Sequence, residues 1–258
     1  MQQATLTTSG APPTRRSARP RRRVSVAGVI GELLITAGVI TLLYVVWQLW
    51  VGDMIYGAQR NATGNETITR WAQEYVPPAD WPDEEPIAET FEPIILPEPA
   101  DTEVFGVMRV PRFGADYAVE MAGGVTRPGT LDPIGIGHYP GSPMPGEVGN
   151  FALAGHRTTW GKPFNQVAEL RIDDPIVVET ADGWYTYRFR TLQYVRPDEV
   201  DVLLPVPQEL DVEATTSYIT LTSCSPMFSM AERIVAYGVF DSFTPRDAGA
   251  PSALNEGA

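Results

Sequence analysis

A continuous apolar stretch near the N-terminus limits what this chain can fold into. Residues 24–51 read VSVAGVIGELLITAGVITLLYVVWQLWV and contain a single charged residue, Glu32. A helix of about 20 apolar residues crosses the hydrocarbon core of a bilayer, so we predict a membrane-spanning helix here. The alternative is a cleaved signal peptide, whose apolar core is shorter, about 7 to 15 residues, and precedes a small-residue cleavage site. The sequence VGDMIYGAQR at residues 51–60 offers no convincing site of that kind.

Charge is distributed unevenly on the two sides of this stretch. The net charge is −13, yet residues 1–23 contain six arginines and no acid. Basic flanks of a span stay on the cytoplasmic side, so we expect a cytoplasmic N-terminal tail over residues 1–23 and an acidic body outside the cell membrane. An acidic body also argues against nucleic acid as a partner, because phosphate binding needs a basic face. The six are Arg15, Arg16, Arg19, Arg21, Arg22 and Arg23.

Two further segments have the composition of connecting chain. Residues 52–101 combine eleven acids with two arginines and contain seven prolines. Proline-rich stretches block regular structure and favour extended chain, so we predict an acidic stalk there. Residues 246–258 are rich in Ala, Gly and Pro. We expect them to form a disordered tail.

Residues 102–245 have the pattern of an all-β domain. Seven segments are short, rich in β-branched and aromatic residues, and bounded by Gly, Pro, Asp or Asn. The triplet Ala181-Asp182-Gly183 predicts a hairpin turn, and only short helical pieces fit between strands, near 130–136 and 164–170. Seven or eight strands in this length indicate a closed barrel or a sandwich. The segments span residues 103–111, 115–121, 150–156, 174–180, 184–195, 216–224 and 233–240.

Few residue types in this chain can carry chemistry. It has one cysteine, two histidines and one lysine. A structural zinc site usually takes four Cys or His ligands, more than exist here, and the three that exist lack the paired spacing of a catalytic site. No Walker or dinucleotide-type glycine loop is present. The sequence therefore predicts neither a metal nor a cofactor.

The single cysteine, Cys224, follows a strand-like segment at a point where the chain turns. Such a residue can be merely a small buried hydrophobe. A thiol nucleophile, in contrast, needs a base or cation that favours the thiolate and a donor for the oxyanion. His156 ends the strand-like NFALAGH, and Arg233 opens the strand after that of the cysteine. We therefore regard Cys224, His156 and Arg233 as candidate catalytic residues.

Three features together resemble the signature of sortases, the cysteine transpeptidases of Gram-positive cell surfaces. They are AGHRTTWGKPFNQVAEL at residues 154–170, TLTSC at residues 220–224, and an arginine nine residues beyond the cysteine. The similarity covers roughly residues 103–240. GHYPGSPMPGEVGN at residues 137–150, with the apolar helix and the acidic stalk, is similar to class E of the family. The resemblance implies a closed β-barrel of about eight strands.

The resemblance also implies a reaction and its residues. Cys224 would attack the peptide bond between Thr and Gly in a C-terminal sorting signal of the LAxTG or LPxTG type. His156 would transfer protons to and from the amines, and Arg233 would stabilise the oxyanion. Tyr139 is associated in class E with a preference for LAxTG, and Ser223 stands where many members carry threonine. The expected substrate-binding residues are Tyr139, Thr222 and Ser223.

Sortase membership would also define partners and location. The partners would be exported proteins with sorting signals and an amine of a peptidoglycan precursor, and the enzyme would lie in the cell membrane with its catalytic domain outside. His138, among glycines and prolines, is expected on a loop, with a structural or substrate-adjacent role. Two alternatives stay open: another cell-wall cysteine enzyme, such as an L,D-transpeptidase or papain-like peptidase, and an anchored binding module that buries the thiol.

Overall fold

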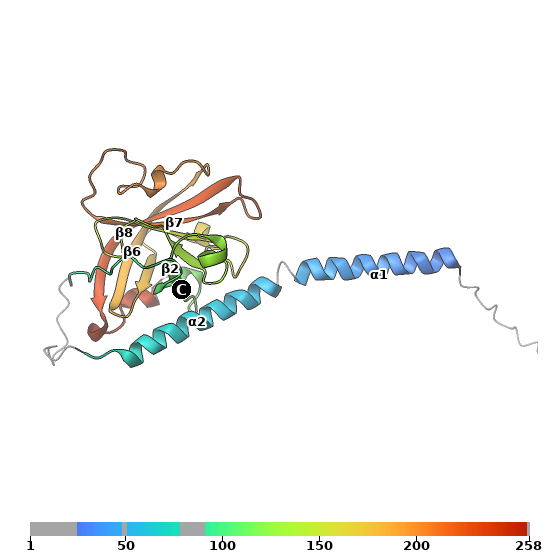
Figure 1. Ribbon diagram of the computed structural model, residues 1–258, viewed down its shortest axis with the longest axis horizontal. Coiled ribbons are helices and arrows are strands. Elements are labelled where there is room, and N and C mark those ends of the chain that lie inside the picture. Colours follow the sequence, from blue (N-terminus) through green and yellow to red (C-terminus); the bar gives the residue numbers. More distant parts are fainter. Residues whose placement is uncertain (1–24, 48–50, 78–90, 257–258) are drawn as a thin grey trace, which may run out of the picture. The chain divides into compact units, whose positions relative to one another are not determined.

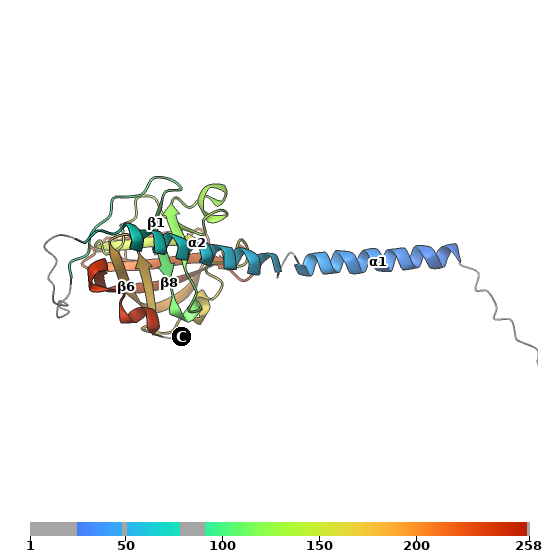
Figure 2. The same cartoon turned by 90° about the horizontal axis from the view of Figure 1, so that it is seen from below.

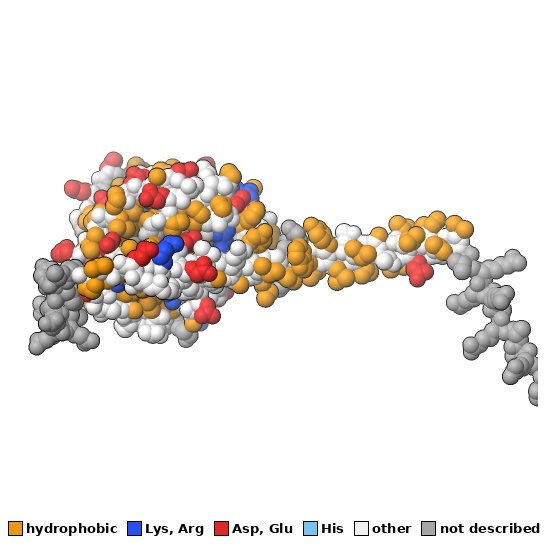
Figure 3. Space-filling view, turned by 60° about the horizontal axis from the view of Figure 1, so that its bottom comes forward, with side chains coloured by type: hydrophobic (Ala, Val, Ile, Leu, Met, Phe, Trp, Pro, Cys, Tyr) orange, Lys and Arg blue, Asp and Glu red, His pale blue; other side chains and the backbone are white. Residues whose placement is uncertain are grey.

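The computed structural model describes residues 25–47, 51–77 and 91–256, which fall into two units, 1–45 and 46–258. Helix α1 (Val26–Val46), all but the last residue of which belongs to the first unit, is 21 residues long and exposed along nearly its whole length. Exposed hydrophobic side chains are spread along the helix on the face seen in Figure 3. The expected apolar helix is thus confirmed, and its length and composition suffice to cross a membrane. The predicted basic tail lies outside the described residues.

Eight strands close into a barrel in the second unit (Figure 1). Around the barrel the order is β1-β2-β3-β4-β7-β8-β6-β5. Neighbours pair antiparallel except β2 with β3 and β4 with β7, which run parallel. The predicted all-β closed barrel is therefore confirmed. The strands are β1 (Val104–Arg109), β2 (Val119–Gly123), β3 (Ile136–His138), β4 (Gly149–Gly155), β5 (Pro175–Glu179), β6 (Gly183–Val195), β7 (Ser217–Ser225) and β8 (Glu232–Pro245).

The alternation of side chains along β4 and β7 decides which of them face the barrel interior. Phe151 and Leu153 of β4 and Ile219 and Leu221 of β7 are fully buried in the main core cluster. Successive side chains of a strand point to opposite faces of the sheet. The residues between and beyond these four, at even-numbered positions of both strands, therefore lie on the outer face of the barrel.

One strand of the barrel was not predicted. The sequence predicts a short helical piece near residues 130–136 and a loop at His138, but Ile136–His138 forms β3 between β2 and β4. Glycines hide the alternating pattern there. A Cβ on Gly137 would lie 2.2 Å from the carbonyl oxygen of Gly124, so the close approach requires glycine. The hairpin turn before β6 is confirmed, since β5 and β6 pair on either side of it.

The prediction of irregular stalk over residues 52–101 is wrong for its first part. Helix α2 (Gly52–Glu74) occupies residues 52–74 and lies against the barrel (Figure 2). All seven prolines of the region follow this helix, beginning at Pro77, so nothing in residues 52–74 interrupts helical hydrogen bonding. A Cβ on Gly64 would lie 2.3 Å from the carbonyl oxygen of Ala118, so the helix packs closely on the start of β2.

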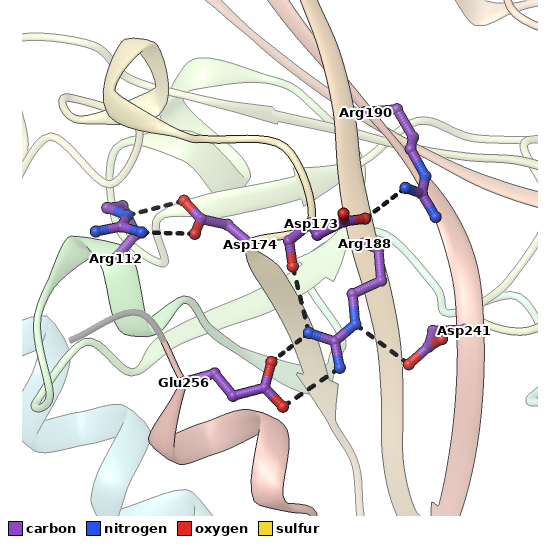
Figure 4. A network of polar contacts seen from close by, with 7 residues as sticks. All are labelled: Arg112, Asp173, Asp174, Arg188, Arg190, Asp241 and Glu256. Carbon is purple, nitrogen blue, oxygen red and sulfur yellow. Dashed lines mark hydrogen bonds and ion pairs between the residues drawn. The ribbon is translucent and has the colours of Figure 1, made fainter.

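The prediction of a disordered C-terminal tail is also wrong for residues 246–256. Two short 3-10 helices, η6 (Arg246–Ala248) and η7 (Ser252–Asn255), form there. Ala253 is buried against Val177 and Trp184. Glu256 accepts hydrogen bonds from Arg188 of β6, as Figure 4 shows. Apolar packing and a charge-assisted contact hold the tail, neither of which its composition indicated.

Two adjacent aspartates differ sharply in their surroundings (Figure 4). Asp174 is 6% exposed and accepts two hydrogen bonds from Arg112, at 2.8 and 2.7 Å, and a third from the backbone N–H of Arg171. Burial alone would raise the pKa of Asp174, but these hydrogen bonds outweigh it and lower the pKa. Asp173 pairs instead with Arg190 at the surface, where both side chains are about half exposed.

We expect Asp174→Asn to lower the free energy of unfolding by about 1 to 3 kcal/mol, because Arg112 loses its charged acceptor. Asp173→Asn is the matched control and should change it by less than about 0.5 kcal/mol. The folded pKa of Asp174 lies below its unfolded value, so the pair stabilises at neutral pH and this stabilisation is lost in acid. Urea unfolding at pH 7 and pH 3 measures both effects. Equal losses in the two variants would contradict the assignment.

Candidate active site

The three candidate catalytic residues converge at one end of the outer face of β4, β7 and β8. Cys224 and Arg233 are directly opposite each other in the β7–β8 ladder. Ala154 pairs with Thr222 at the end of the parallel β4–β7 ladder, and His156 and Cys224 each follow two positions further along the chain. All three occupy outward-facing positions, since each alternates with inward-facing core residues of its strand: Leu153 in β4, Leu221 in β7 and Ile234 in β8. Barrel closure thus gathers residues that are up to 77 positions apart in sequence.

Cys224 is partly exposed and is a free thiol. Arg233 is also partly exposed, and its Nη1 donates to the carbonyl oxygens of Met230 and Glu232 at 3.2 and 3.0 Å. Within the part of the chain that the structure describes, no carboxylate forms an ion pair with this guanidinium. Its charge and remaining donors are therefore available to an anion formed at Cys224.

His156 makes a contact that the sequence does not predict. Its Nε2 lies 2.6 Å from a carboxylate oxygen of Asp132, in the loop between β2 and β3. A carboxylate can only accept, so Nε2 carries the proton of this bond and Nδ1 is left as the basic nitrogen of the neutral ring. Asp132 precedes Pro133 and lies outside the segments that resemble the sortase signature. No periodic or spacing signal in the sequence pointed to it.

The protonation of His156 reflects competing influences. Burial is the largest and lowers the pKa of His156; the hydrogen bond and charge of Asp132 raise it, and the charges of Arg127 and Arg60 lower it. The net direction is a pKa below the ordinary 6.5, even though Asp132 is close enough for an ion pair. Burial prevails because the ring is 12% exposed. The imidazole is thus predominantly neutral at pH 7.

The expected substrate-binding residues have different positions. Thr222 donates to the carbonyl oxygen of Leu153 at 3.0 Å, so its hydroxyl accepts from the Tyr139 hydroxyl, also at 3.0 Å. Tyr139 and Thr222 therefore adjoin each other on the outer face, two positions along β7 from Cys224. Ser223 points inward and is 3% exposed, and its hydroxyl donates to the carbonyl oxygen of Gly155 at 2.7 Å. Its side chain ties β7 to β4 and is not accessible to a substrate.

His138 does not belong to this group. It is 1% exposed, and its ring lies 5.4 Å from the Phe151 ring within the barrel. Its Nε2 donates to the carbonyl oxygen of Pro143 at 3.2 Å and lies 2.8 Å from the Ser142 hydroxyl. Burial lowers its pKa, so the ring is neutral. Of the two roles expected for His138, the position agrees with the structural one. Among the described residues, no group of three or more His, Cys, Asp or Glu side chains could hold a metal ion.

Comparison with known proteins places this arrangement in a family. Residues 108–241, about half of the chain, match the model of the sortase domain. The chain belongs to the sortase family. The matched residues include Tyr139, His156, Cys224 and Arg233 and exclude helix α2.

Three relatives refine the position of this sortase. It is 34% identical to sortase SrtE1 of Streptomyces coelicolor over 93% of its own length, but spans only 64% of that protein. It is 31% identical to sortase SrtE2 of the same species, covering 85% of this chain and 84% of that one. The SrtA sortase from Actinomyces oris has 32% identity and a TM-score of 0.60, over 63% of this chain and 93% of that one.

The crystal structure of sortase E1 from Streptomyces coelicolor, which contains a tripeptide in the active site, is 36% identical with a TM-score of 0.55. It covers 59% of this chain and 97% of that one. These relatives confirm the predicted class E sortase, a family of cysteine transpeptidases. They favour this over the other cell-wall cysteine enzymes and over a binding module.

Proposed function

We propose that this sortase cleaves a C-terminal sorting signal between Thr and Gly and transfers the acyl group to an amine of a peptidoglycan precursor. The observation that carries the proposal is the convergence of Cys224, His156 and Arg233 at one end of the outer face. The tripeptide bound in the active site of the Streptomyces coelicolor sortase E1 structure supports a peptide substrate. The substrates would be exported proteins that carry signals of the LAxTG or LPxTG type.

Each proposed step uses groups that lie together. The thiol of Cys224 gives its proton to the neutral ring of His156, the thiolate sulfur forms a bond to the Thr carbonyl carbon, and Arg233 stabilises the oxyanion of the tetrahedral intermediate. The C–N bond then breaks, and the imidazolium of His156 gives its proton to the departing glycine amine. In the second half, the incoming amine attacks the thioester and loses a proton to His156. The thiolate of Cys224 leaves, and the pair is restored.

The proposed location is the cell membrane, with helix α1 as a single span, the N-terminus in the cytoplasm and the barrel outside. Helix α1 has the length and composition of a span, and the arginines of residues 1–23 agree with this direction. Tethering enzyme and substrate to one surface raises their effective concentration. No cofactor takes part in these steps.

The proposal is tested with the full chain in detergent micelles, LAxTG and LPxTG peptides, and a glycine peptide as the amine. Mass spectrometry should find a product cleaved after Thr and, with the amine present, an adduct joined through Thr. A thioester of Cys224 should accumulate when no amine is added, because hydrolysis is the slower fate of the acyl-enzyme. Absence of cleavage of both peptides by folded enzyme would refute the proposed substrate class.

Tyr139 is proposed to bind the signal, with a preference for LAxTG. The hydroxyl of Thr222 holds the Tyr139 hydroxyl by a hydrogen bond. Tyr139→Phe loses this bond and leaves the ring free to move, which should weaken the binding free energy of the peptide by about 1 kcal/mol. We therefore expect KM for LAxTG peptide to rise about fivefold, with kcat little changed. Tyr194→Phe, at a tyrosine that is 55% exposed, is the control. Peptide kinetics with both variants check this. An unchanged KM in Tyr139→Phe would exclude the hydroxyl from binding.

A further inference from the structure

A buried arginine on helix α2 contacts both loops that carry the His156–Asp132 pair. Arg60 is 8% exposed. Its Nε donates to the carbonyl oxygen of Trp160 at 2.7 Å, and its two terminal nitrogens donate to those of Pro133 and Asp132 at 3.2 and 2.5 Å. Trp160 follows His156 by four residues, and Asp132 is the partner of His156 itself. One rigid guanidinium thus joins the backbones of the two loops whose side chains meet at the imidazole.

We propose that Arg60 is a positioning residue, which holds the two loops at the separation that keeps Asp132 hydrogen-bonded to His156. This inference rests on the proposed role of His156 in proton transfer. Arg60 touches no reacting atom in the steps above and would act only through the pair. Helix α2, predicted as a stalk, would then be a part of the catalytic unit, although the sortase-domain match begins only at residue 108.

The path of the Arg60 side chain depends on glycines in both loops. A Cβ on Gly161 would lie 2.9 Å from both Cδ and Nε of Arg60. A Cβ on Gly135 would lie 3.0 Å from Nη1 of Arg60 and 2.8 Å from Val119. Both glycines also have a positive φ, of 76° and 131°. The loops therefore leave the space that the guanidinium occupies, and other residues at these positions would displace it.

The chemistry of the contacts suits positioning more than charge pairing. Burial lowers the pKa of Arg60, and the charges of Asp132 and Glu120 oppose this effect. Its hydrogen-bond acceptors are backbone carbonyl oxygens, which cannot swing away as a side chain does. Buried N–H donors need hydrogen-bond acceptors. Separating the loops would leave donors of the guanidinium without acceptors and would raise the free energy of the folded protein. Arg60 therefore resists the loop movement that would part Asp132 from His156.

Attachment of the helix to the barrel does not depend on Arg60 alone. Thr67 donates to a carboxylate oxygen of Glu120 at 2.6 Å, and the backbone N–H of Ala118 donates to the side-chain oxygen of Asn61 at 3.3 Å. Gly64 adds its close contact with Ala118. Loss of the guanidinium should therefore leave α2 docked while it loosens the loops, which makes the two roles separable by experiment.

The test compares Arg60→Gln and Arg60→Lys with Arg70→Gln in the full chain. Arg70 is the matched control because it lies on the same helix, is exposed, and its removal changes the charge equally. In Arg60→Gln we expect kcat for peptide cleavage to fall by about 10- to 100-fold with KM little changed, since small misplacements of an acid–base group have effects of this size. Arg60→Lys should also lose kcat, because one ammonium cannot bridge both loops. Arg70→Gln should stay within about twofold.

A second readout is independent of activity. Nitrogen-15 NMR of the imidazole rings reports which nitrogen carries the proton, and the chain has only two histidines, so a His156→Gln spectrum identifies the signals of His156. The wild type should show the Nε2–H form, and both Arg60 variants should show a mixture of the two tautomers. This measurement remains valid if the wild type cleaves neither peptide, so failure of the proposed function and failure of this inference are distinguishable.

The inference is overturned if Arg60→Gln folds and keeps wild-type kcat and the Nε2–H form. If Arg60→Gln does not fold, Arg60→Lys decides: wild-type kcat and tautomer in a lysine variant would show that the bridge between the loops is not needed. A fall in kcat with an unchanged ring spectrum would likewise contradict positioning through His156.

Discussion

Replacement of Cys224 by alanine is expected to lower kcat/KM for sorting-signal cleavage by at least about 10³-fold. The reaction proposed here passes through a bond to the sulfur, and no other thiol exists in the chain. Removal of a nucleophile from a covalent mechanism has effects of this order or larger. Peptide cleavage assayed by chromatography measures the loss. Cleavage by Cys224→Ala at close to the wild-type rate would refute the proposed mechanism.

Controls for this variant follow from the position of the thiol. Cys224 is partly exposed on the outer face, so a methanethiosulfonate reagent should label the native wild type rapidly and should not label Cys224→Ala at all. Labelling only after unfolding would favour a buried, inert cysteine. Ser223→Ala is the matched neighbour, since Ser223 faces the interior. It should lose about 1 kcal/mol of stability through its hydrogen bond to Gly155 and keep most of its activity.

The second large effect is expected from Asp132→Asn. Asparagine can accept from a protonated Nε2 through its carbonyl oxygen or donate its NH2 group to an unprotonated Nε2, so it no longer enforces the Nε2–H form of His156. We expect kcat to fall by about 10- to 100-fold, within the range that general acid–base catalysis contributes. Asp116→Asn, at an exposed aspartate before β2, is the control and should change kcat little. An unchanged kcat in Asp132→Asn would show that the 2.6 Å contact does not serve the reaction.

The pH dependence gives this variant a second signature. The Cys224–His156 pair is active when its two side chains together hold one proton. The activity of the wild type as a function of pH should therefore be bell-shaped. A rate that is flat from pH 5 to 10 would contradict this expectation. Burial holds the pKa of His156 below 6.5, while Asp132 raises it. Loss of the Asp132 charge should therefore lower the pKa further and move the acid limb of kcat/KM to lower pH. A shift to higher pH would contradict this assignment.

Local patterns in the sequence predicted much of the barrel because period-two alternation is a property of each strand alone. The alternation in NFALAGH and TSYITLTSC puts Phe151 and Leu221 inside and His156 and Cys224 outside. The same rule failed at β3, where glycines carry no hydrophobic signal. For Ser223 the rule held: its place beside Cys224 in the alternation requires the inward position that it has, whereas the resemblance to sortases implied a substrate-binding residue.

Two predictions were wrong because they relied on the average composition of a whole segment. The prolines of residues 52–101 all follow position 74, so the average hid a helix of 23 residues in the first part. The tail at 246–256 has few hydrophobic residues, yet Ala253 packs against Trp184 and is buried. Burial of a single small side chain depends on the surface that receives it, and composition contains no information about that surface.

The apolar helix, the all-β domain, and the outward position of the one thiol, its histidine and its arginine in their own strands follow from the sequence alone. These follow from short-range periodicity and from the scarcity of cysteine and histidine. The contact of Asp132 with His156 and the bridge of Arg60 between their loops arise only in the folded chain. These contacts link residues 24 to 100 positions apart. They form because closing the barrel and docking α2 bring the loops together, and no local pattern specifies which polar groups then become neighbours.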